Sequence, residues 1–485
     1  MQSQIDFLKP VFLAVWACVA AFAIWETRVR ESDSTAALAA GIVLLASLLL
    51  SRFVLQLPFK TAPMLYLALL GFVHLGAVVP WALGLYDLGR TPWLSPYGMS
   101  RALALITYSI VSYQLGLLVA LRGREFRNKP FEDDSEELKG SRIFVAGSFL
   151  FFLGAIMFVV GLIQLDPTGY YHLTYSETFR LRAESDPRFF GTGITFAFIG
   201  LCMTAAGASR RQTRAAFCYA AIFFLVLFYL GFRSPAITAV LLVCAVSYKK
   251  GIKLPRLIPL VAAVALLVAV PLVRITREQP TNAQSLARSL LEINILDGPA
   301  EVGGAIRPLV ETIDLVGPGT YRHGRTYLIT MKGIVPNLAF HWEAAAPESI
   351  DDLPPNHWVT AIVDPWARQN HEGIGFSGVA EPYMNFGLAG VIIYFPLLAF
   401  LLVRLEQVSI QSSYVLASWA LIVGPLLWTT RNDFTDFFRP AVWGLMCVGL
   451  VRLSSGGLNF ISRDRRVGGI GGKARISDAT RLEGI

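Results

Sequence analysis

Residues 375–406 read GFSGVAEPYMNFGLAGVIIYFPLLAFLLVRLE. The second half of this stretch is a continuous apolar run, and roughly 20 such residues can cross a bilayer as a helix. The first half carries a carboxylate, Glu381, among small, aromatic and amide side chains just before the apolar run begins. The stretch therefore predicts a membrane-spanning helix with polar, turn-rich chemistry at its entrance.

The rest of the chain has the same apolar character. Of its 485 residues, 54% are hydrophobic and only 16% are charged, and the mean hydropathy is +0.53. A soluble protein carries about 25% charged residues. Within lipid the backbone has to satisfy its own hydrogen bonds, which leaves helices or closed β-barrels. Because the apolar runs are continuous rather than alternating, the sequence predicts an all-α polytopic membrane protein.

The apolar runs predict about 12 transmembrane helices. A signal peptide is the alternative interpretation of the first run, because small alanines lie near its end, but the topology favours an uncleaved span. The predicted spans cover about residues 11–27, 36–51, 62–84, 100–121, 142–164, 190–208, 215–232, 235–248, 257–275, 387–404, 413–430 and 440–453.

The lysines orient these spans. Eight of the nine lysines fall in connections on one side of the predicted bundle, and only Lys332 falls on the other side. Cytoplasmic connections carry the excess of basic residues. We therefore expect a multi-pass protein with both termini in the cytoplasm.

Two long connections lie on the non-cytoplasmic face. They cover residues 165–189 and about 277–386, and the second is too rich in Trp, Tyr, Ile and Leu for a disordered tether. Its segments NAQSLARSLLEINIL and AEVGGAIRPLVETIDLV have the apolar spacing of short amphipathic helices. We predict four parts: spans within 1–276, a folded, partly helical cap at 277–386, spans within 387–453, and a basic cytoplasmic tail at 454–485.

Several chemistries find no support in the sequence. All five cysteines lie in apolar runs and no CxxC occurs, which argues against a disulfide framework and a zinc site. GGIGGKA at 468–474 lacks both the first Gly and the final Ser or Thr of a phosphate-binding loop. The acidic run EDDSEE at 132–137 is typical of a solvated loop. We therefore expect no metal, no cofactor and no nucleic-acid partner.

Arginine is abundant on the predicted outer face. A guanidinium group offers a planar fork of donors that suits phosphate and stays charged when it is partly desolvated. Orientation alone would disfavour cations on this face, so their number indicates an anionic ligand. The arginines assigned to this face are Arg28, Arg30, Arg90, Arg101, Arg180, Arg182, Arg188, Arg233, Arg274, Arg277, Arg288, Arg307, Arg322, Arg325, Arg368, Arg431 and Arg439.

Single arginines have structural as well as functional interpretations. Arg233, in the short turn GFRSPA, either snorkels to lipid headgroups or binds a ligand. Arg274 and Arg277 share one helical face near the membrane, where ionisable groups are costly and usually functional. Arg431, in WTTRNDFTDFFRPAVWG, either binds a ligand or forms salt bridges with the neighbouring aspartates.

The loop YYHLTYSETFRLR alternates aromatic residues with Arg180 and Arg182. Aromatic faces can stack on sugar rings and arginine can bind phosphate, although tyrosine is also common at membrane interfaces. Base candidates are Glu381 and His323, and a solvated loop residue is the alternative for each. Further candidates for substrate or pyrophosphate binding are Arg322, Arg325, Tyr327, Tyr383 and Asn385.

Together these segments resemble a known family. GRTYL and IVPNLAF within 324–340, followed by GFSGVAEPYMNFGLAGV at 375–391, resemble the bacterial oligosaccharide repeat-unit polymerases, the Wzy or O-antigen polymerase family. GFRSPAI at 231–237 is similar to the short Gly-x-Arg turn of that family, and TRNDF at 430–434 to its Arg/Asp segment. The stretch AEPYMNFG is the most specific part, and the overall architecture is similar too.

The resemblance implies a glycosyltransferase of the bacterial inner membrane, with a fold like the GT-C type by analogy only. Its substrates would be oligosaccharides linked to undecaprenyl pyrophosphate. It would join them at the periplasmic face into a polysaccharide such as O-antigen, capsule or exopolysaccharide. Membrane lipids and a chain-length regulator protein would be its other partners.

The chemistry of such a transfer fits the residues. Preorganised arginines can stabilise a departing pyrophosphate in place of a metal, and the candidates are Arg233, Arg274, Arg277 and Arg431. Glu381 or His323 could take the proton of the acceptor hydroxyl.

Other readings stay open. A ligase that moves finished glycan to another acceptor, such as a lipid A core, is barely separable by sequence. A transporter or flippase is disfavoured, because the polar residues lie in outer loops rather than mid-span. A pure scaffold protein would leave the arginine-rich outer face unexplained.

Overall fold

The computed structural model describes residues 2–29, 33–90, 99–122, 135–165, 188–230, 232–252, 294–334, 349–369 and 373–467, and the regular structure of these residues is helical. Seven of the described helices are long and apolar enough to cross a membrane. They comprise residues Lys9–Thr27, Asp33–Val54, Met99–Ala120, Gly140–Gln164, Phe189–Gly207, Ala380–Val408 and Thr435–Ser454. Shorter apolar helices cover Ala62–Leu75, Thr213–Phe228, Pro235–Lys249 and Ser413–Trp428.

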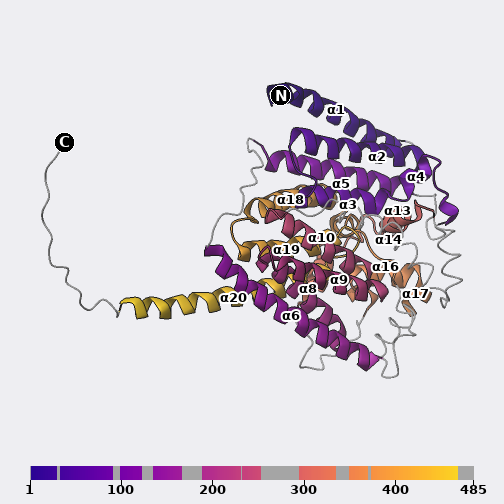
Figure 1. Ribbon diagram of the computed structural model, residues 1–485. Helices are drawn as coiled ribbons and strands as arrows, with labels where there is room; N and C mark the ends of the chain where they lie inside the picture. The colour runs from indigo at the N-terminus through magenta and orange to yellow at the C-terminus, as the bar shows by residue number, and fades with distance from the viewer. Residues whose placement is uncertain are drawn as a thin grey trace, which may run out of the picture.

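The longer elements form a bundle (Figure 1). They are α1 (Gln2–Val29), α2 (Asp33–Leu49) with its π-helical end η1 (Leu50–Val54), α3 (Ala62–Leu75), α5 (Met99–Ala120), α6 (Ser135–Leu165), α8 (Arg188–Gly207), α9 (Thr213–Tyr229), α10 (Arg233–Lys249), α18 (Ala380–Val408), α19 (Ser413–Trp428) and α20 (Thr435–Val467).

Short helices lie in the connections. They are α4 (Val78–Ala82), η2 (Leu88–Arg90), α13 (Asp297–Val302), η4 (Gly303–Ala305), α14 (Ile306–Leu315), α15 (Arg325–Lys332), η5 (Ile350–Asp352), α16 (Pro355–Val363) and α17 (Pro365–Gln369). Figure 1 shows α13, α14, α16 and α17 together at one end of the bundle, opposite the end from which α20 projects. We call the end with these short helices the cap end.

The predicted amphipathic segment AEVGGAIRPLVETIDLV is confirmed as helical. It forms α13, the 3-10 turn η4 and α14, and α14 buries Ile306, Leu309 and Ile313. Most of the other segment, NAQSLARSLLEINIL, lies outside the described residues.

The predicted spans agree with helices wherever the structure describes them, and the predicted span at 257–275 lies outside the described residues. Several helices extend beyond the predicted bounds, as α1, α6 and α20 do, and two boundaries differ for a reason that the structure shows. The run at 62–84 is divided, because α3 ends at Leu75 and Gly76 lies against the chain near Pro299; a Cβ on Gly76 would meet the Pro299 carbonyl oxygen at 2.5 Å. The run predicted to begin at 387 instead begins at Ala380, as the first turns of α18.

The contact between α6 and α8 depends on glycine. Glycines recur every seventh residue on each helix and face the other helix. A Cβ on Gly154 would lie 2.3 Å from the backbone nitrogen of Ala197, and one on Gly200 would lie 2.2 Å from that of Phe151. Small residues allow membrane helices to approach closely and pack their backbones together. The complete set is Gly140, Gly147, Gly154 and Gly161 on α6, and Gly193, Gly200 and Gly207 on α8.

A buried ion pair joins four helices at the end of the bundle opposite the cap. The Lys249 ammonium group of α10 pairs with the Glu406 carboxylate of α18, and both side chains are buried. Lys249 also donates to the Ser409 hydroxyl (2.9 Å) and lies 4.4 Å from the ring centre of Trp419 on α19. The second oxygen of Glu406 accepts the backbone N–H of Ala62 at the start of α3 (3.2 Å). This network therefore fixes α3, α10, α18 and α19 against one another.

Candidate active site at the break in helix α18

Helix α18 is broken at Gly387, which has φ 62° and ψ −151°. In an unbroken helix the carbonyls of Met384 and Asn385 would accept N–H groups four residues further on. Here they accept instead the N–H groups of Arg322 and His323, each at 3.0 Å. The break thus exposes two carbonyls, and the turn Tyr-Arg-His-Gly at 321–324 satisfies them, as buried backbone groups require.

This turn needs a special backbone conformation. His323 has φ 48° and Gly324 has φ 86°, both in the left-handed region. The Gly324 N–H donates to the side-chain oxygen of Asn385 (2.9 Å). The sequence YRHGRTY is therefore joined by three hydrogen bonds to the first turns of α18, although about 60 residues separate the two segments.

Glu381 lies at the centre of this contact and is only 1% exposed. One carboxylate oxygen accepts the hydroxyl of Thr326 (2.9 Å), and the other accepts the backbone N–H of Phe434 (3.0 Å). The Asn385 amide donates to the Thr326 hydroxyl oxygen (2.6 Å) and to the Glu381 carbonyl (2.9 Å). Glu381, Asn385 and Thr326 therefore form one connected polar network.

A second buried carboxylate, Asp433, lies one residue before Phe434. It accepts the backbone N–H groups of Asn356 (3.0 Å) and Thr435 (3.1 Å). Burial raises the pKa of the Asp433 carboxyl above its ordinary value. Backbone amides at the starts of α16 and α20 therefore bind Asp433.

Aromatic residues surround the two carboxylates. The ring of Tyr327 meets Phe434 edge to face, with centroids 5.4 Å apart. Burial and the neighbouring Glu381 raise the pKa of the Tyr327 hydroxyl, so Tyr327 is protonated at neutral pH. Tyr383 is buried and meets Tyr321 edge to face at 6.1 Å. The surroundings of Glu381 are thus largely apolar, which strengthens each hydrogen bond that it accepts.

Two predicted anion-binding arginines already have carboxylate partners. Arg322 donates to Asp351 (2.7 Å) and its guanidinium carbon lies 4.8 Å from the ring centre of Trp358. Arg325 donates to Asp352 (2.6 Å). The hydrogen bond from Arg322 lowers the pKa of Asp351 below its ordinary value. An anionic ligand at either arginine would therefore have to displace an aspartate.

The remaining predicted site residues are more scattered. His323 belongs to the turn through its backbone, and its side chain is exposed. Arg431 is partly buried, and its carbonyl accepts the N–H of Phe376 (3.3 Å) just before α18. Arg233 is the first residue of α10. The other predicted arginines, Arg180, Arg182, Arg274 and Arg277, lie outside the described residues.

The structure adds residues to this site that the sequence did not single out. Thr326 lies in the quoted motif GRTYL, but nothing local marks its hydroxyl as a partner of Glu381. Ser377 lies four residues before Glu381 and is hydrogen-bonded to His74 of α3 (2.7 Å), whose other ring nitrogen is bonded to the Leu70 carbonyl (2.8 Å). His74 therefore joins α3 to the segment that precedes Glu381.

Metal binding finds no candidate here. Among the residues that the structure describes, no three His, Cys, Asp or Glu side chains come together in a way that could hold a metal ion. What the described site offers is a pair of buried carboxylates and neighbouring arginines at the cap end of the bundle.

Bundle and site together define a multi-pass helical membrane protein with buried carboxylates at one end of the bundle. No curated protein and no solved structure matches the chain. The family model of the O-antigen polysaccharide polymerase Wzy matches residues 11–456, and the chain belongs to this family. The predicted resemblance is thereby confirmed. Membership implies a glycosyltransferase-type enzyme that polymerises lipid-linked repeat units.

Proposed function

We propose that this chain joins oligosaccharide repeat units, carried on undecaprenyl pyrophosphate, into a polysaccharide at the periplasmic face of a bacterial inner membrane. The product would be O-antigen, capsule or exopolysaccharide. The observation that carries the proposal is the buried Glu381 carboxylate at the cap end, in a chain of the Wzy family. A folded, partly helical cap at 277–386 and about 12 spans, with both termini in the cytoplasm, remain part of the proposal.

The orientation has support from the lysines. Lys249 is the last residue of α10 and Lys250 follows it, at the end of the bundle opposite the cap. Lys60 lies over the ring of Tyr248 at that same end. An excess of basic residues marks the cytoplasmic side. The cap end would then face the periplasm, where lipid-linked units would be available.

In the proposed step, a hydroxyl at the non-reducing end of a new lipid-linked unit attacks the anomeric carbon of the growing chain. The new glycosidic bond forms as the bond from that carbon to the pyrophosphate oxygen breaks, and undecaprenyl pyrophosphate leaves with the electron pair. The proton of the hydroxyl passes to a base, for which Glu381 is the first candidate and His323 the second.

Glu381 has to be uncovered before it can act. Thr326 now donates the hydrogen bond that an acceptor hydroxyl would donate to the same carboxylate oxygen. The acceptor would therefore replace Thr326, and the 321–326 segment would move aside as the sugar enters. Tyr327, Tyr383 and Asn385 are the proposed sugar-binding neighbours.

Arginines would stabilise the departing pyrophosphate, since preorganised cations at a developing negative charge are effective catalysts. Arg322 and Arg325 would exchange Asp351 and Asp352 for pyrophosphate oxygens. The other arginines proposed for this role are Arg180, Arg182, Arg233, Arg274, Arg277 and Arg431. The proposal needs neither a metal nor a cofactor, and it includes a chain-length regulator as a partner.

The test supplies purified, membrane-reconstituted protein with lipid-linked repeat units alone. A polymerase produces a ladder of products, whereas a ligase that lacks its acceptor, or a transporter, produces none. Glu381→Gln should abolish the ladder at normal protein level. Glu311→Gln, a matched change on the partly exposed face of α14, should leave the ladder unchanged. A normal ladder from Glu381→Gln would remove Glu381 as the base.

A further inference from the structure

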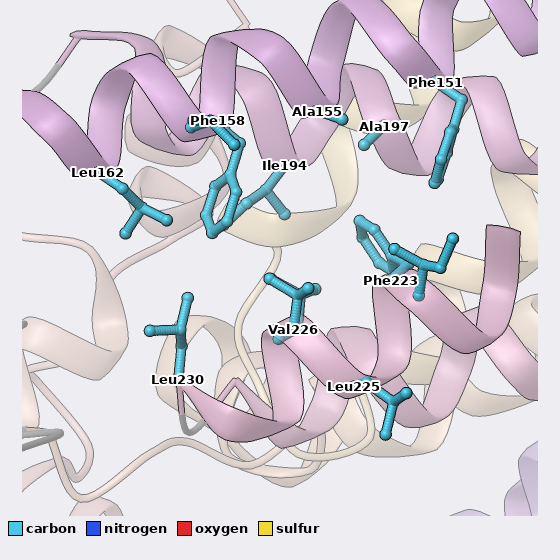
Figure 2. A pocket seen from close by; sticks show the side chains of 13 residues that line it. Phe151, Ala155, Phe158, Leu162, Ile194, Ala197, Phe223, Leu225, Val226 and Leu230 are labelled. Atoms are coloured by element: carbon cyan, nitrogen blue, oxygen red, sulfur yellow. The ribbon is translucent and has the colours of Figure 1, made fainter. Parts of the chain in front are cut away.

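Helices α6, α8 and α9 enclose an apolar cavity of about 500 Å³ (Figure 2). Figure 2 shows Phe158, Leu162 and Ile194 on one side of it and Val226 and Leu230 on the other. All thirteen lining residues are Phe, Ala, Val, Leu or Ile. Binding sites for small ligands span about 300–1,000 Å³, so the cavity is large enough to hold part of a ligand chain.

The cavity follows from how the three helices pack. Glycines bring α6 and α8 into backbone contact, so these two helices form one closed wall. Phe151 of α6 stacks on Tyr219 of α9, with ring centres 4.7 Å apart, and holds α9 away from α6. Beyond that stack, the wall presents the small side chains of Ala155 and Ala197. The space between the walls is therefore left open rather than filled.

One side of the cavity faces the surface that would contact lipid. Ile222 and Leu225, which line it, are 54% and 65% exposed. The cavity is thus a groove that a lipid chain could enter sideways from the bilayer. Its stacked end, at Phe151, lies in the middle of α6 and closes the groove toward the membrane interior.

The other end of the groove leads toward the start of α10. Leu230 lines this end, and α10 begins three residues later at Arg233. The rings of Phe158, Phe190 and Phe232 continue from the groove toward this turn, with centroid separations of 5.0 and 5.7 Å. The apolar path therefore ends near the backbone at the start of α10, a helix whose first residue is an arginine.

This end belongs to the side of the bundle that carries Glu381. Helix α8 runs antiparallel to α6 and packs its other face on α19 and α20, through Phe198 with Trp428 (5.2 Å) and Phe196 with Trp443 (5.6 Å). The connection between α19 and α20 carries Asp433 and Phe434. The backbone N–H of Phe434 donates a hydrogen bond to Glu381. Helix α8 thus lines the groove with one face and contacts α19 and α20 with another.

We propose that this groove holds the isoprene units next to the pyrophosphate of a lipid-linked substrate, with Arg233 at its mouth as a partner of the pyrophosphate; the inference rests on the proposed function. An apolar chain that ends in a dianionic headgroup suits a groove that is apolar along its length and ends near the start of a helix whose first residue is an arginine. A methyl-branched isoprenoid chain is broader than a straight acyl chain, and the groove is wide where Ala155 and Ala197 face it. The remainder of the chain would extend into the bilayer past Leu225.

The test uses the full-length protein in nanodiscs and a polyisoprenyl pyrophosphate with a diazirine in the isoprene units next to the headgroup. Photolysis should label peptides of α6 and α9. Ala155→Phe fills the groove and should reduce this labelling about tenfold and raise KM for lipid-linked units with kcat unchanged. Ile156→Phe is the matched control, because Ile156 is 63% exposed and does not line the groove.

Val226→Trp fills the groove from α9 and keeps the test decisive if Ala155→Phe does not fold. Labelling elsewhere, or equal competition by a phospholipid with straight acyl chains, would overturn the groove as the carrier site. Polymer formed by wild-type protein without groove labelling would overturn this inference and leave the proposed function standing. Groove labelling without any polymer would support the groove as a carrier site while the polymerase proposal fails.

Discussion

Replacing Gly200 with alanine tests the close contact between α6 and α8. The added Cβ would lie 2.2 Å from the backbone nitrogen of Phe151, whereas ordinary van der Waals contact begins at 3.4 Å. Because the obstacle is backbone, no change of rotamer can relieve the clash. The two helices would have to separate by roughly 1 Å at this point, and protein interiors have little free space to absorb such a shift.

The added methyl group of Gly200→Ala both lowers and raises the free energy of unfolding, and the two effects can be compared. Inserting a methyl group into a packed core costs about 1–3 kcal/mol, while alanine favours a helix over glycine by about 1 kcal/mol. Separating the helices also weakens the contacts at the neighbouring glycines. The difference between the cost and the gain is about 0–2 kcal/mol, and we expect the free energy of unfolding to fall by about 2 kcal/mol, the upper end of this range.

Thermal unfolding of the detergent-purified protein measures this change as a lower Tm. Gly449→Ala on α20 is the matched control, because nothing lies within 4 Å of its added Cβ. That variant should keep the Tm or raise it. If Gly200→Ala were as stable as the control, the backbones of α6 and α8 could not be in the contact described.

Three further outcomes are expected. Thr326→Val should destabilise the protein by about 2 kcal/mol, because a buried carboxylate loses a hydrogen bond, and Thr326→Ser should not; equal Tm values for the two would contradict the network. Glu406→Gln leaves Lys249 buried without its counter-charge and should cost about 3 kcal/mol in thermal unfolding, so an unchanged Tm would argue against that ion pair. Asp351→Asn should release Arg322 and tighten binding of a lipid pyrophosphate severalfold in a filter-binding assay, since exposed ion pairs contribute about 0.2–1 kcal/mol; weaker binding would exclude that exchange.

The sequence predicts the helices well because a span is a local property. Each long apolar run carries its own signal for membrane crossing, and every such run within the described residues is a helix. The shifted boundaries at α3 and at the start of α18 depend on contacts between distant segments. α3 stops at Leu75 where the chain near Pro299 lies against Gly76, and α18 begins early because its first turns pair with residues 322–324. Neither contact can be read from the runs themselves.

In the candidate site too, the sequence indicates single residues, whereas their contacts depend on the fold. Glu381 stands out in sequence, since a carboxylate at the start of an apolar run is unusual. Its partners Thr326 and Phe434 lie 55 and 53 residues away along the chain, so only the fold brings them together. Composition likewise indicates an arginine-rich face, but it cannot show that Arg322 has a carboxylate partner. The glycines of α6 and α8 recur every seventh residue, and this spacing is visible in the sequence as a sign of close helix packing.

Gly387 divides α18 into a short segment that carries Glu381 and a longer apolar segment. Its backbone lies outside the helical region, and as a glycine it can adopt further φ and ψ values at little steric cost to itself. The short segment with Glu381 can then tilt with the turn that covers it, while the longer segment stays anchored in lipid. Under the proposed function, a bulky glycan could be admitted and released at each addition without withdrawing any hydrophobic residue from the bilayer.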